Sequence, residues 1–184
     1  SEQYSEAVED LTKVIELDPN EADAYRYRGY AYYDLDLYSE AVVDLTKYIK
    51  SDPNDADAYR YRGYAYYFLD LYSEAVVDLT KAIKLDPNDA EAYRIRGNAY
   101  YFLEQYAEAI EDLTKAIKLD PNETDAYRIR GYAYYELEQF SEAVEYLTKY
   151  IKSDPNEAEA YAEAYRVRGY AYYKSEQYSE AVED

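Results

Sequence analysis

The arginine residues are the groups in this sequence whose type and spacing could do chemistry. All of them lie in five copies of a Tyr-Arg-x-Arg-Gly motif, which end at Gly29, Gly63, Gly97, Gly131 and Gly169. Tyrosine, with 30 residues, is their most frequent neighbour. Arginine and tyrosine provide large contact areas, directional hydrogen bonds and stacking, and they dominate the binding hot spots of protein interfaces. The motif therefore indicates recognition of a partner.

Catalysis has little support in the composition. The chain contains neither Cys nor His, which excludes thiolate and imidazole metal ligands, a Cys nucleophile and a His-based general base. Its acidic residues are spread over a repeat, and no carboxylate pair is set apart by its surroundings. The glycines never cluster, so no phosphate-binding loop is expected. We expect no enzyme activity, no cofactor and no metal site.

Charge and hydrophobicity limit the class of protein. The 184 residues carry a formal net charge of −20, yet hydrophobic residues make up 48% of the chain, which is too many for an acidic disordered segment. No apolar run approaches the roughly 18 residues that a membrane span needs, and no targeting segment is recognisable. We expect a soluble, folded, acidic protein, and the sequence leaves its compartment open.

A repeat of about 34 residues organises the chain and is typical of helical solenoids. Each unit closes with proline inside Asp-Pro-Asn, at Pro19, Pro53, Pro87, Pro121 and Pro155. In the unit that closes at Pro53, the spacing of apolar residues predicts two helices, over about 22–35 and 38–51. A glycine recurs in the middle of the first helix, where it costs about 1 kcal/mol relative to alanine. Its recurrence indicates that another helix must approach closely.

These residues resemble the tetratricopeptide repeat family. In that family, aromatic residues flank the glycine of the first helix, and small and large residues alternate along the second helix before a closing proline. The matching residues of the first complete unit are Tyr25, Gly29, Tyr32, Ala41, Leu45 and Pro53. The resemblance implies an all-α, right-handed superhelical solenoid of antiparallel helix pairs, and it fits a natural array as well as an engineered one.

The repeat also sets the boundaries that we expect within a single solenoid at 1–184. The segments are a lone second helix at 1–20, complete repeats at 21–54, 55–88, 89–122 and 123–156, and a partial repeat at 157–184. The partial repeat contains a four-residue insertion. Since four residues are about one helical turn, we expect an additional early turn of helix that bears Tyr161.

Two positions depart from the family pattern. The turn between the paired helices carries an acidic residue in place of the usual glycine, so we expect a strained or extended turn. An arginine stands just before the glycine of the first helix, where it needs a partner if it is buried. The predicted pairs are Arg28 with Asp44, Arg62 with Asp78 and Arg96 with Asp112. Tyr146 takes the Asp position in the fourth unit, so Arg130 must find another partner.

The resemblance implies that one side of each first helix lines a concave groove. Half of the arginines and two rows of aromatic residues fall on that side, which suits an extended peptide with carboxylates or a partner helix. The predicted peptide-binding residues are Arg26, Tyr30, Tyr33, Arg60, Tyr64, Tyr67, Phe68, Arg94, Asn98, Tyr101, Phe102, Arg128, Tyr132, Tyr135, Arg166, Tyr170 and Tyr173. Asn98 interrupts a tyrosine row, and Phe68 and Phe102 stand where other units have charged residues. The middle of the groove is therefore the favoured place for a specific contact.

Other interpretations compete with a peptide groove. The groove arginines could stack on tyrosine rings or pair with the acidic residues three positions before them, and so keep the furrow soluble. Residues 175–184 repeat the sequence of residues 1–10, which predicts either a longer array or a unit that stacks head to tail on copies of itself. A nucleic-acid partner is disfavoured by the net charge of −20, and no membrane partner is expected.

Overall fold

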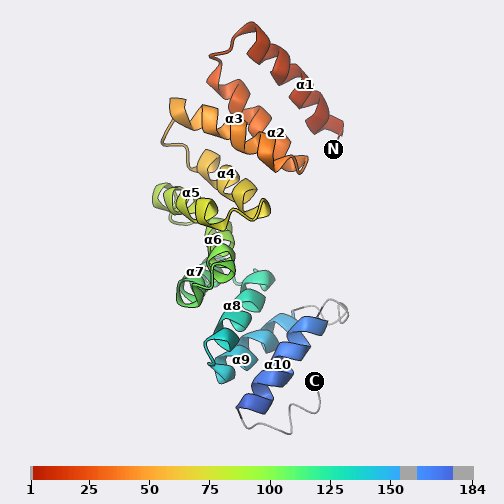
Figure 1. Cartoon of the computed structure of the whole chain (residues 1–184), viewed down its shortest axis with the longest axis vertical. Coiled ribbons are helices and arrows are strands. Elements are labelled where there is room, and N and C mark those ends of the chain that lie inside the picture. Colours follow the sequence, from red (N-terminus) through yellow and green to blue (C-terminus); the bar gives the residue numbers. More distant parts are fainter. Residues whose placement is uncertain (1, 154–160, 176–184) are drawn as a thin grey trace. The chain divides into compact units, whose positions relative to one another are not determined.

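The computed structural model describes residues 2–153 and 161–175, and in these residues it contains helices and no strand (Figure 1). The helices are α1 (Glu2–Leu17), α2 (Ala22–Asp34), α3 (Tyr38–Ser51), α4 (Ala56–Phe68), α5 (Tyr72–Leu85), α6 (Ala90–Phe102), α7 (Tyr106–Leu119), α8 (Thr124–Glu136), α9 (Phe140–Ile151) and α10 (Ala162–Lys174). The predicted all-α class is confirmed. None of the described helices combines the length and the apolar character needed to cross a bilayer.

The chain divides into two units, Ser1–Asn88 and Asp89–Asp184. In unit 1, α2 pairs with α3 and α4 with α5, while α1 packs on α2 and α3 on α4. In unit 2, α6 pairs with α7 and α8 with α9, while α7 packs on α8 and α9 on α10. Each pair is a hairpin, in which the first helix carries the arginine motif. The hairpins stack because each leaves an apolar face that only the next hairpin covers.

The ends of the helices agree with the sequence pattern. The helices expected over about 22–35 and 38–51 are observed as α2, Ala22–Asp34, and α3, Tyr38–Ser51. The acidic residue that follows Asp-Pro-Asn caps α2, α4 and α6, but not α8. In α4, Asp55 Oδ1 accepts a hydrogen bond of 3.0 Å from the Ala58 N–H. Side-chain caps of this kind satisfy amides that lack a partner within the helix.

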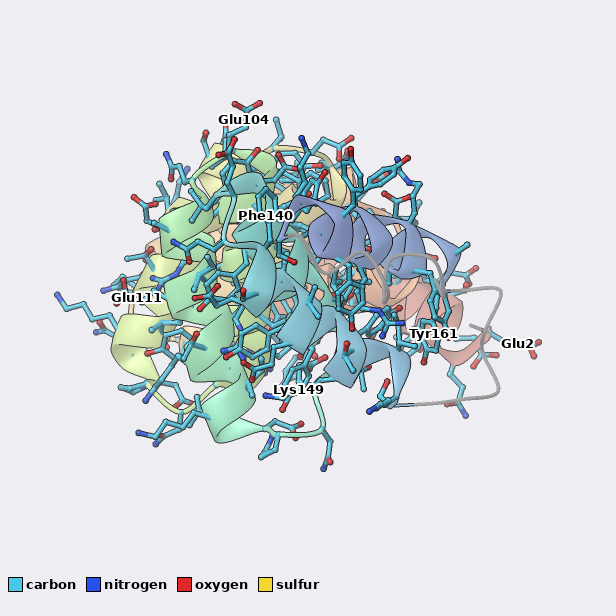
Figure 2. The ribbon with its side chains drawn as sticks, turned by 90° about the horizontal axis from the view of Figure 1, so that it is seen from below. Glu2, Glu104, Glu111, Phe140, Lys149 and Tyr161 are labelled. Atoms are coloured by element: carbon cyan, nitrogen blue, oxygen red, sulfur yellow. The ribbon has the colours of Figure 1, made fainter. Side chains whose placement is uncertain are left out.

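The turn inside each hairpin places an acidic residue in the left-handed region of backbone space. Within residues 2–153 and 161–175, φ is positive at Asp36, Asp70, Glu104 and Glu138, with values of 59° or 60°. In the first hairpin the Leu37 N–H donates to Tyr32 O at 2.9 Å and the Asp36 N–H donates to Tyr33 O at 3.0 Å. This is a Schellman motif, whose geometry requires the left-handed residue that is usually glycine. The prediction of a strained turn is confirmed, and Figure 2 shows Glu104 projecting away from the helices at such a turn.

The glycine of each first helix lies against a leucine of its paired second helix. A Cβ atom added to Gly29 would lie 2.8 Å from Leu45 Cγ, a separation that side chains do not tolerate. Gly63, Gly97 and Gly131 meet Leu79, Leu113 and Leu147 in the same way. All four leucines are fully buried. The close approach of helices that the glycine predicted is therefore confirmed.

The arginine before each glycine forms the predicted pair. Arg28 donates from Nε to Asp44 Oδ2 at 2.6 Å and from Nη2 to Asp44 Oδ1 at 2.9 Å. Its Nη1 donates to Thr12 Oγ1 at 2.9 Å, so the side chain joins α3 of its own hairpin to α1. The pairs Arg62 with Asp78 and Arg96 with Asp112 are present as well. These pairs tie neighbouring helices together through charge-assisted hydrogen bonds.

In the fourth hairpin, formed by α8 and α9, the arginine before the glycine has a different partner. The Arg130 guanidinium lies 3.6 Å from the centre of the Tyr146 ring, and its Nη1 donates to Thr114 Oγ1 at 2.9 Å. The prediction that Arg130 finds another partner is thus confirmed, and that partner is the ring that replaces the aspartate. Burial lowers the pKa of Arg130, and the neighbouring tyrosines and Glu145 offset this effect only in part.

The insertion in the last repeat is predicted to add an early helical turn that bears Tyr161, and most of that turn would fall in residues 154–160, outside the described part of the chain. Helix α10 begins at Ala162, seven residues before Gly169, which is the distance from Ala22 to Gly29 in α2. The described residues therefore hold no additional turn of helix, and residues 154–160 lie outside them. Tyr161 instead precedes the helix with its side chain in the core, 4.7 Å from the Tyr150 ring centre and 3% exposed.

Candidate functional site

A pocket opens in unit 2 where first helices of successive hairpins lie side by side, α6 against α8 and α8 against α10. We call it the unit-2 pocket, and its volume is about 340 Å³. Its lining residues are Tyr101, Phe102, Arg128, Ile129, Tyr132, Tyr135, Glu136, Glu163, Arg166, Val167 and Tyr170. Seven of these eleven belong to the predicted groove set. Most of the pocket lining therefore comes from residues that the sequence analysis assigns to the groove side of the first helices.

Helical spacing explains how the pocket is lined. Arg128, Tyr132 and Tyr135 follow one another at steps of four and three along α8, which puts them on one side of the helix. Gly131 lies on another side, against α9. The side that does not contact the paired helix is therefore left to form the pocket wall.

The other ten predicted residues are distributed over both units. Those in unit 1 are Arg26, Tyr30, Tyr33, Arg60, Tyr64, Tyr67 and Phe68, and those in unit 2 are Arg94, Asn98 and Tyr173. One row of the set is largely buried between hairpins, at Tyr64, Asn98 and Tyr132. Four aromatic members are exposed: Phe68, Phe102, Tyr170 and Tyr173. Packing thus divides the set into structural residues and residues that solvent can reach.

The groove arginines form ion pairs along their own helices. Each contacts the carboxylate three residues before it: Asp23 with Arg26, Asp57 with Arg60, Glu91 with Arg94, Asp125 with Arg128 and Glu163 with Arg166. Residues at i and i+3 are neighbours on a helix surface, so this pairing follows from the sequence spacing. It agrees with the competing interpretation that the arginines keep the furrow soluble.

Contacts between hairpins extend the pairing in unit 1. Arg26 Nη1 donates to Asp55 Oδ2 at 3.2 Å, and the Tyr48 hydroxyl donates to the same oxygen at 2.9 Å. Burial alone would raise the pKa of Asp55, but hydrogen bonds from the Ala58 N–H, Tyr48 and Arg26 hold it below its usual value. Asp55 therefore stays ionised, and its bonds hold α2, α3 and α4 together.

The corresponding cluster in unit 2 contains more carboxylates. Arg94 lies 3.4 Å from Glu91, 3.3 Å from Glu123 and 3.5 Å from Asp125. Asn98 Nδ2 donates to Asp125 Oδ2 at 3.2 Å. Burial raises the pKa of Glu123, an effect that Arg94 opposes and the neighbouring carboxylates reinforce. Asn98 is 3% exposed and is absent from the pocket lining, so its role is to donate this hydrogen bond to Asp125.

Sequence reasoning missed the acidic and aliphatic residues of the pocket. Glu136 and Glu163 carry its negative charge, and Ile129 and Val167 are its aliphatic lining residues. The sequence did contain a signal for Glu136. Its position varies more between repeats than any other position of the first helix, and it carries aspartate, phenylalanine, glutamate or lysine. Variation within a regular repeat marks a place where packing does not fix the residue.

Comparison with family models covers most of the chain. Models described as "Tetratricopeptide repeat" match residues 1–62, 96–158 and 131–184, and one described as "TPR repeat" matches residues 71–103. A search of curated proteins finds no match.

Solved structures similar to this chain include two proteins. A crystal structure of MamA is 30% identical, covers 85% of this chain and 91% of its own, and has a TM-score of 0.77. The MamA fragment 41-end from Desulfovibrio magneticus RS-1 is 25% identical, with coverages of 88% and 89% and a TM-score of 0.78. YrrB, described as a TPR protein with an unusual peptide-binding site, is 24% identical, with coverages of 96% and 89% and a TM-score of 0.81.

Proposed function

We propose that this chain, which belongs to the tetratricopeptide repeat family, is a protein-interaction scaffold that binds an extended or helical peptide at the unit-2 pocket. The observation that carries the proposal is the pair of exposed aromatic rings at the pocket, Phe102 at 49% and Tyr170 at 50% exposure. Large apolar rings are kept exposed beside a concavity where a partner covers them. YrrB, which has a similar fold, is described as having a peptide-binding site.

Chemistry at the rim supports binding without catalysis. The pocket combines aromatic faces, two arginines and two glutamates, and Arg166 pairs directly with Glu163. Such a mixture offers hydrogen bonds and contact area, which are the ingredients of a recognition surface. We therefore propose that the scaffold binds its partner and is not an enzyme.

The arginine content, taken without the carboxylates that pair with it, predicts a partner with acidic groups. Arg166 is the groove arginine best placed for such a partner, because 56% of its side-chain surface is exposed. A carboxylate of the partner would have to compete there with Glu163. Binding of an acidic peptide that disappears in Arg166→Gln would support this version of the proposal.

Replacement of the exposed rings tests the site itself. The double variant Phe102→Ala, Tyr170→Ala should weaken binding of peptides selected on an array of extended and helical segments by about 100-fold, which corresponds to about 1.4 kcal/mol for each ring. Fluorescence anisotropy measures the affinity. Val77→Ala removes exposed apolar surface in unit 1 and should leave binding unchanged. Equal affinity of the double variant and Val77→Ala would contradict the proposal.

Self-association is a second candidate function, favoured by one observation on α1. In this 184-residue chain, α1 has no buried residue, and Leu17 is 88% exposed. Leu11 is only half-buried, while Leu45, its counterpart one repeat later, is fully buried. A second copy stacked head to tail would cover this face. Of the segment 175–184 that repeats residues 1–10, residues 176–184 lie outside the described part of the chain.

Light scattering separates the two functions. The variant Val14→Glu, Leu17→Glu places charges on the exposed face of α1, so it should abolish concentration-dependent association without disturbing peptide binding. A strictly monomeric chain over the accessible concentration range would contradict self-association. It would leave the peptide-binding proposal standing.

A further inference from the structure

We infer that the unit-2 pocket receives the cationic side chain of a lysine or arginine, so that the peptide bound there is basic. The inference rests on the proposed function of this pocket. It reverses the sign of charge that the arginine content alone predicts for the partner. Three features carry it: the balance of charge around the pocket, a carboxylate on its wall, and the aromatic rings at its mouth.

The charge balance comes first. Arg94, Arg128 and Arg166 are the arginines on this side of unit 2, and their ion-pair partners are four carboxylates, Glu91, Glu123, Asp125 and Glu163. Glu136 on the pocket wall is a fifth. The arginines are thus already neutralised by the protein itself. An acidic partner would have to displace these carboxylates, and the exchange of one carboxylate for another gains no net charge interaction.

Glu136 supplies the attraction for a cation. It is an exposed residue at the end of α8, and no cation forms an ion pair with it among residues 2–153 and 161–175. Burial, and then the negative charge of Glu136, raise the pKa of the Tyr101 phenol to about 12. The charge of Glu136 therefore makes the electrostatic potential at this wall of the pocket more negative. A lysine ammonium placed there would meet an available carboxylate and lose none of the existing pairs.

The aromatic rings add a surface that suits a cation. The Arg128 guanidinium already lies 5.8 Å from the Tyr132 ring centre, and the Arg166 guanidinium lies 5.7 Å from the Tyr170 ring centre. Rings of this pocket therefore accept cations within the chain itself. Phe102 and Tyr170 line the pocket and remain about half exposed, so a side chain that enters the pocket can contact their rings. A cation near such faces is attracted by the ring quadrupole.

The whole molecule favours the same partner at longer range. With a net charge of −20, the chain attracts basic segments and repels acidic ones before contact. This attraction is diffuse and is screened over about 10 Å at moderate salt. Specific recognition must therefore come from Glu136 and the rings, and an experiment has to separate it from the diffuse term.

Three matched peptides provide the test. The probes are the fluorescein-labelled twelve-residue peptide (Gly-Leu-Ser-Lys)₃ and its counterparts with glutamate or glutamine in place of lysine. Their affinities for the full chain are measured by anisotropy at two salt concentrations. We expect the lysine peptide to bind most tightly. Glu136→Gln should weaken its binding about fivefold, the value of one charge interaction of about 1 kcal/mol in water.

The control keeps the net charge equal. Glu40→Gln removes one exposed carboxylate from α3 in unit 1 and should leave the affinity within the experimental error. Circular dichroism melting of both variants verifies that the fold is intact. Equal weakening by the two variants would mean that only diffuse attraction acts, and it would overturn the inference.

The remaining outcomes distinguish a failure of the cationic pocket from a failure of the proposed peptide-binding function. Tighter binding of the glutamate or glutamine peptide, lost in Phe102→Ala, Tyr170→Ala, would overturn the cationic pocket and leave the peptide-binding proposal standing. If none of the three peptides binds, both the inference and the proposed site are overturned. Weakening by Glu136→Gln together with loss in the double ring variant supports both.

Discussion

The hairpins α4/α5 and α8/α9 hold the same buried arginine in two ways. Arg62 donates to both oxygens of Asp78, at 2.6 and 2.8 Å, and to Thr46 Oγ1 at 3.0 Å. Arg130 keeps the threonine contact but stacks on the ring of Tyr146. Burial by itself lowers the pKa of both arginines, and Asp78 raises that of Arg62 above its usual value. The arginine position is thus preserved while the partner changes from a carboxylate to an aromatic face.

The difference shows what sets the geometry of a hairpin. In both hairpins a Cβ on the glycine would lie within 2.8 Å of the facing leucine, so the spacing of the helices is the same with or without the ion pair. Glycine and leucine therefore fix the approach of the helices. The arginine then takes whatever partner the second helix presents at that distance.

Among these substitutions, loss of the aspartate in the α4/α5 hairpin should lower the free energy of unfolding most. Asp78→Ala leaves the Arg62 guanidinium without its carboxylate in a largely buried site, and we expect the free energy of unfolding to fall by about 3 kcal/mol. Urea unfolding measures the loss. Glu74→Ala, which removes an exposed acid from the same helix, is the control and should change stability by less than about 0.5 kcal/mol. Similar losses in the two variants would show that the pair contributes little.

Filling the glycine position tests whether the two hairpins share one framework. Gly63→Ala and Gly131→Ala each force a methyl group against a buried leucine, and each should destabilise the chain by about 2 kcal/mol. The better helix propensity of alanine, about 1 kcal/mol, offsets part of the clash. Thermal unfolding of both variants makes the comparison. A clear difference between them would mean that the partner of the arginine also sets the helix spacing.

Converting the aromatic hairpin into the ionic one should cost little. Tyr146→Asp gives Arg130 the carboxylate that Arg62 has, and we expect the free energy of unfolding to stay within about 1 kcal/mol of the original, since buried ion pairs and apolar packing nearly balance. Chemical denaturation measures it at low and high salt. Tyr146→Ala leaves Arg130 with neither the aromatic ring nor a carboxylate at this position. This variant should be less stable than Tyr146→Asp. The reverse order would contradict an exchange of equivalent partners.

The turns of the two hairpins differ by a smaller amount. Asp70 and Glu138 both have a φ of 59°, but the Asp70 carboxylate also accepts a hydrogen bond of 2.7 Å from the Tyr72 hydroxyl. Glu138→Gly should therefore stabilise the chain by about 0.5 kcal/mol, while Asp70→Gly should gain less. Differential scanning calorimetry resolves such shifts. Equal gains at both turns would show that the tyrosine hydrogen bond is without effect.

Much of the fold could be predicted because its causes are local and repeated. The bounds of α2 and α3, the Arg28 with Asp44 pair and the tight contact of Gly29 all follow from spacing within one repeat. Each unit imposes the same pattern on the next, so an inference made once holds several times. The pairing of groove arginines with carboxylates three residues earlier has the same local origin.

Stacking of the hairpins decided the rest. Asn98 became a buried partner of Asp125 on the next first helix, and Tyr161 entered the core beside Tyr150. The pocket acquired Glu136 and its negative character from the way α6, α8 and α10 come together. The amino-acid sequence by itself determined the repeat, the helices and the partners within a hairpin, since those depend on separations of a few residues or a fixed offset. Only the tertiary structure decided which side chains between hairpins stay exposed, because burial depends on surfaces that neighbouring repeats bring into contact.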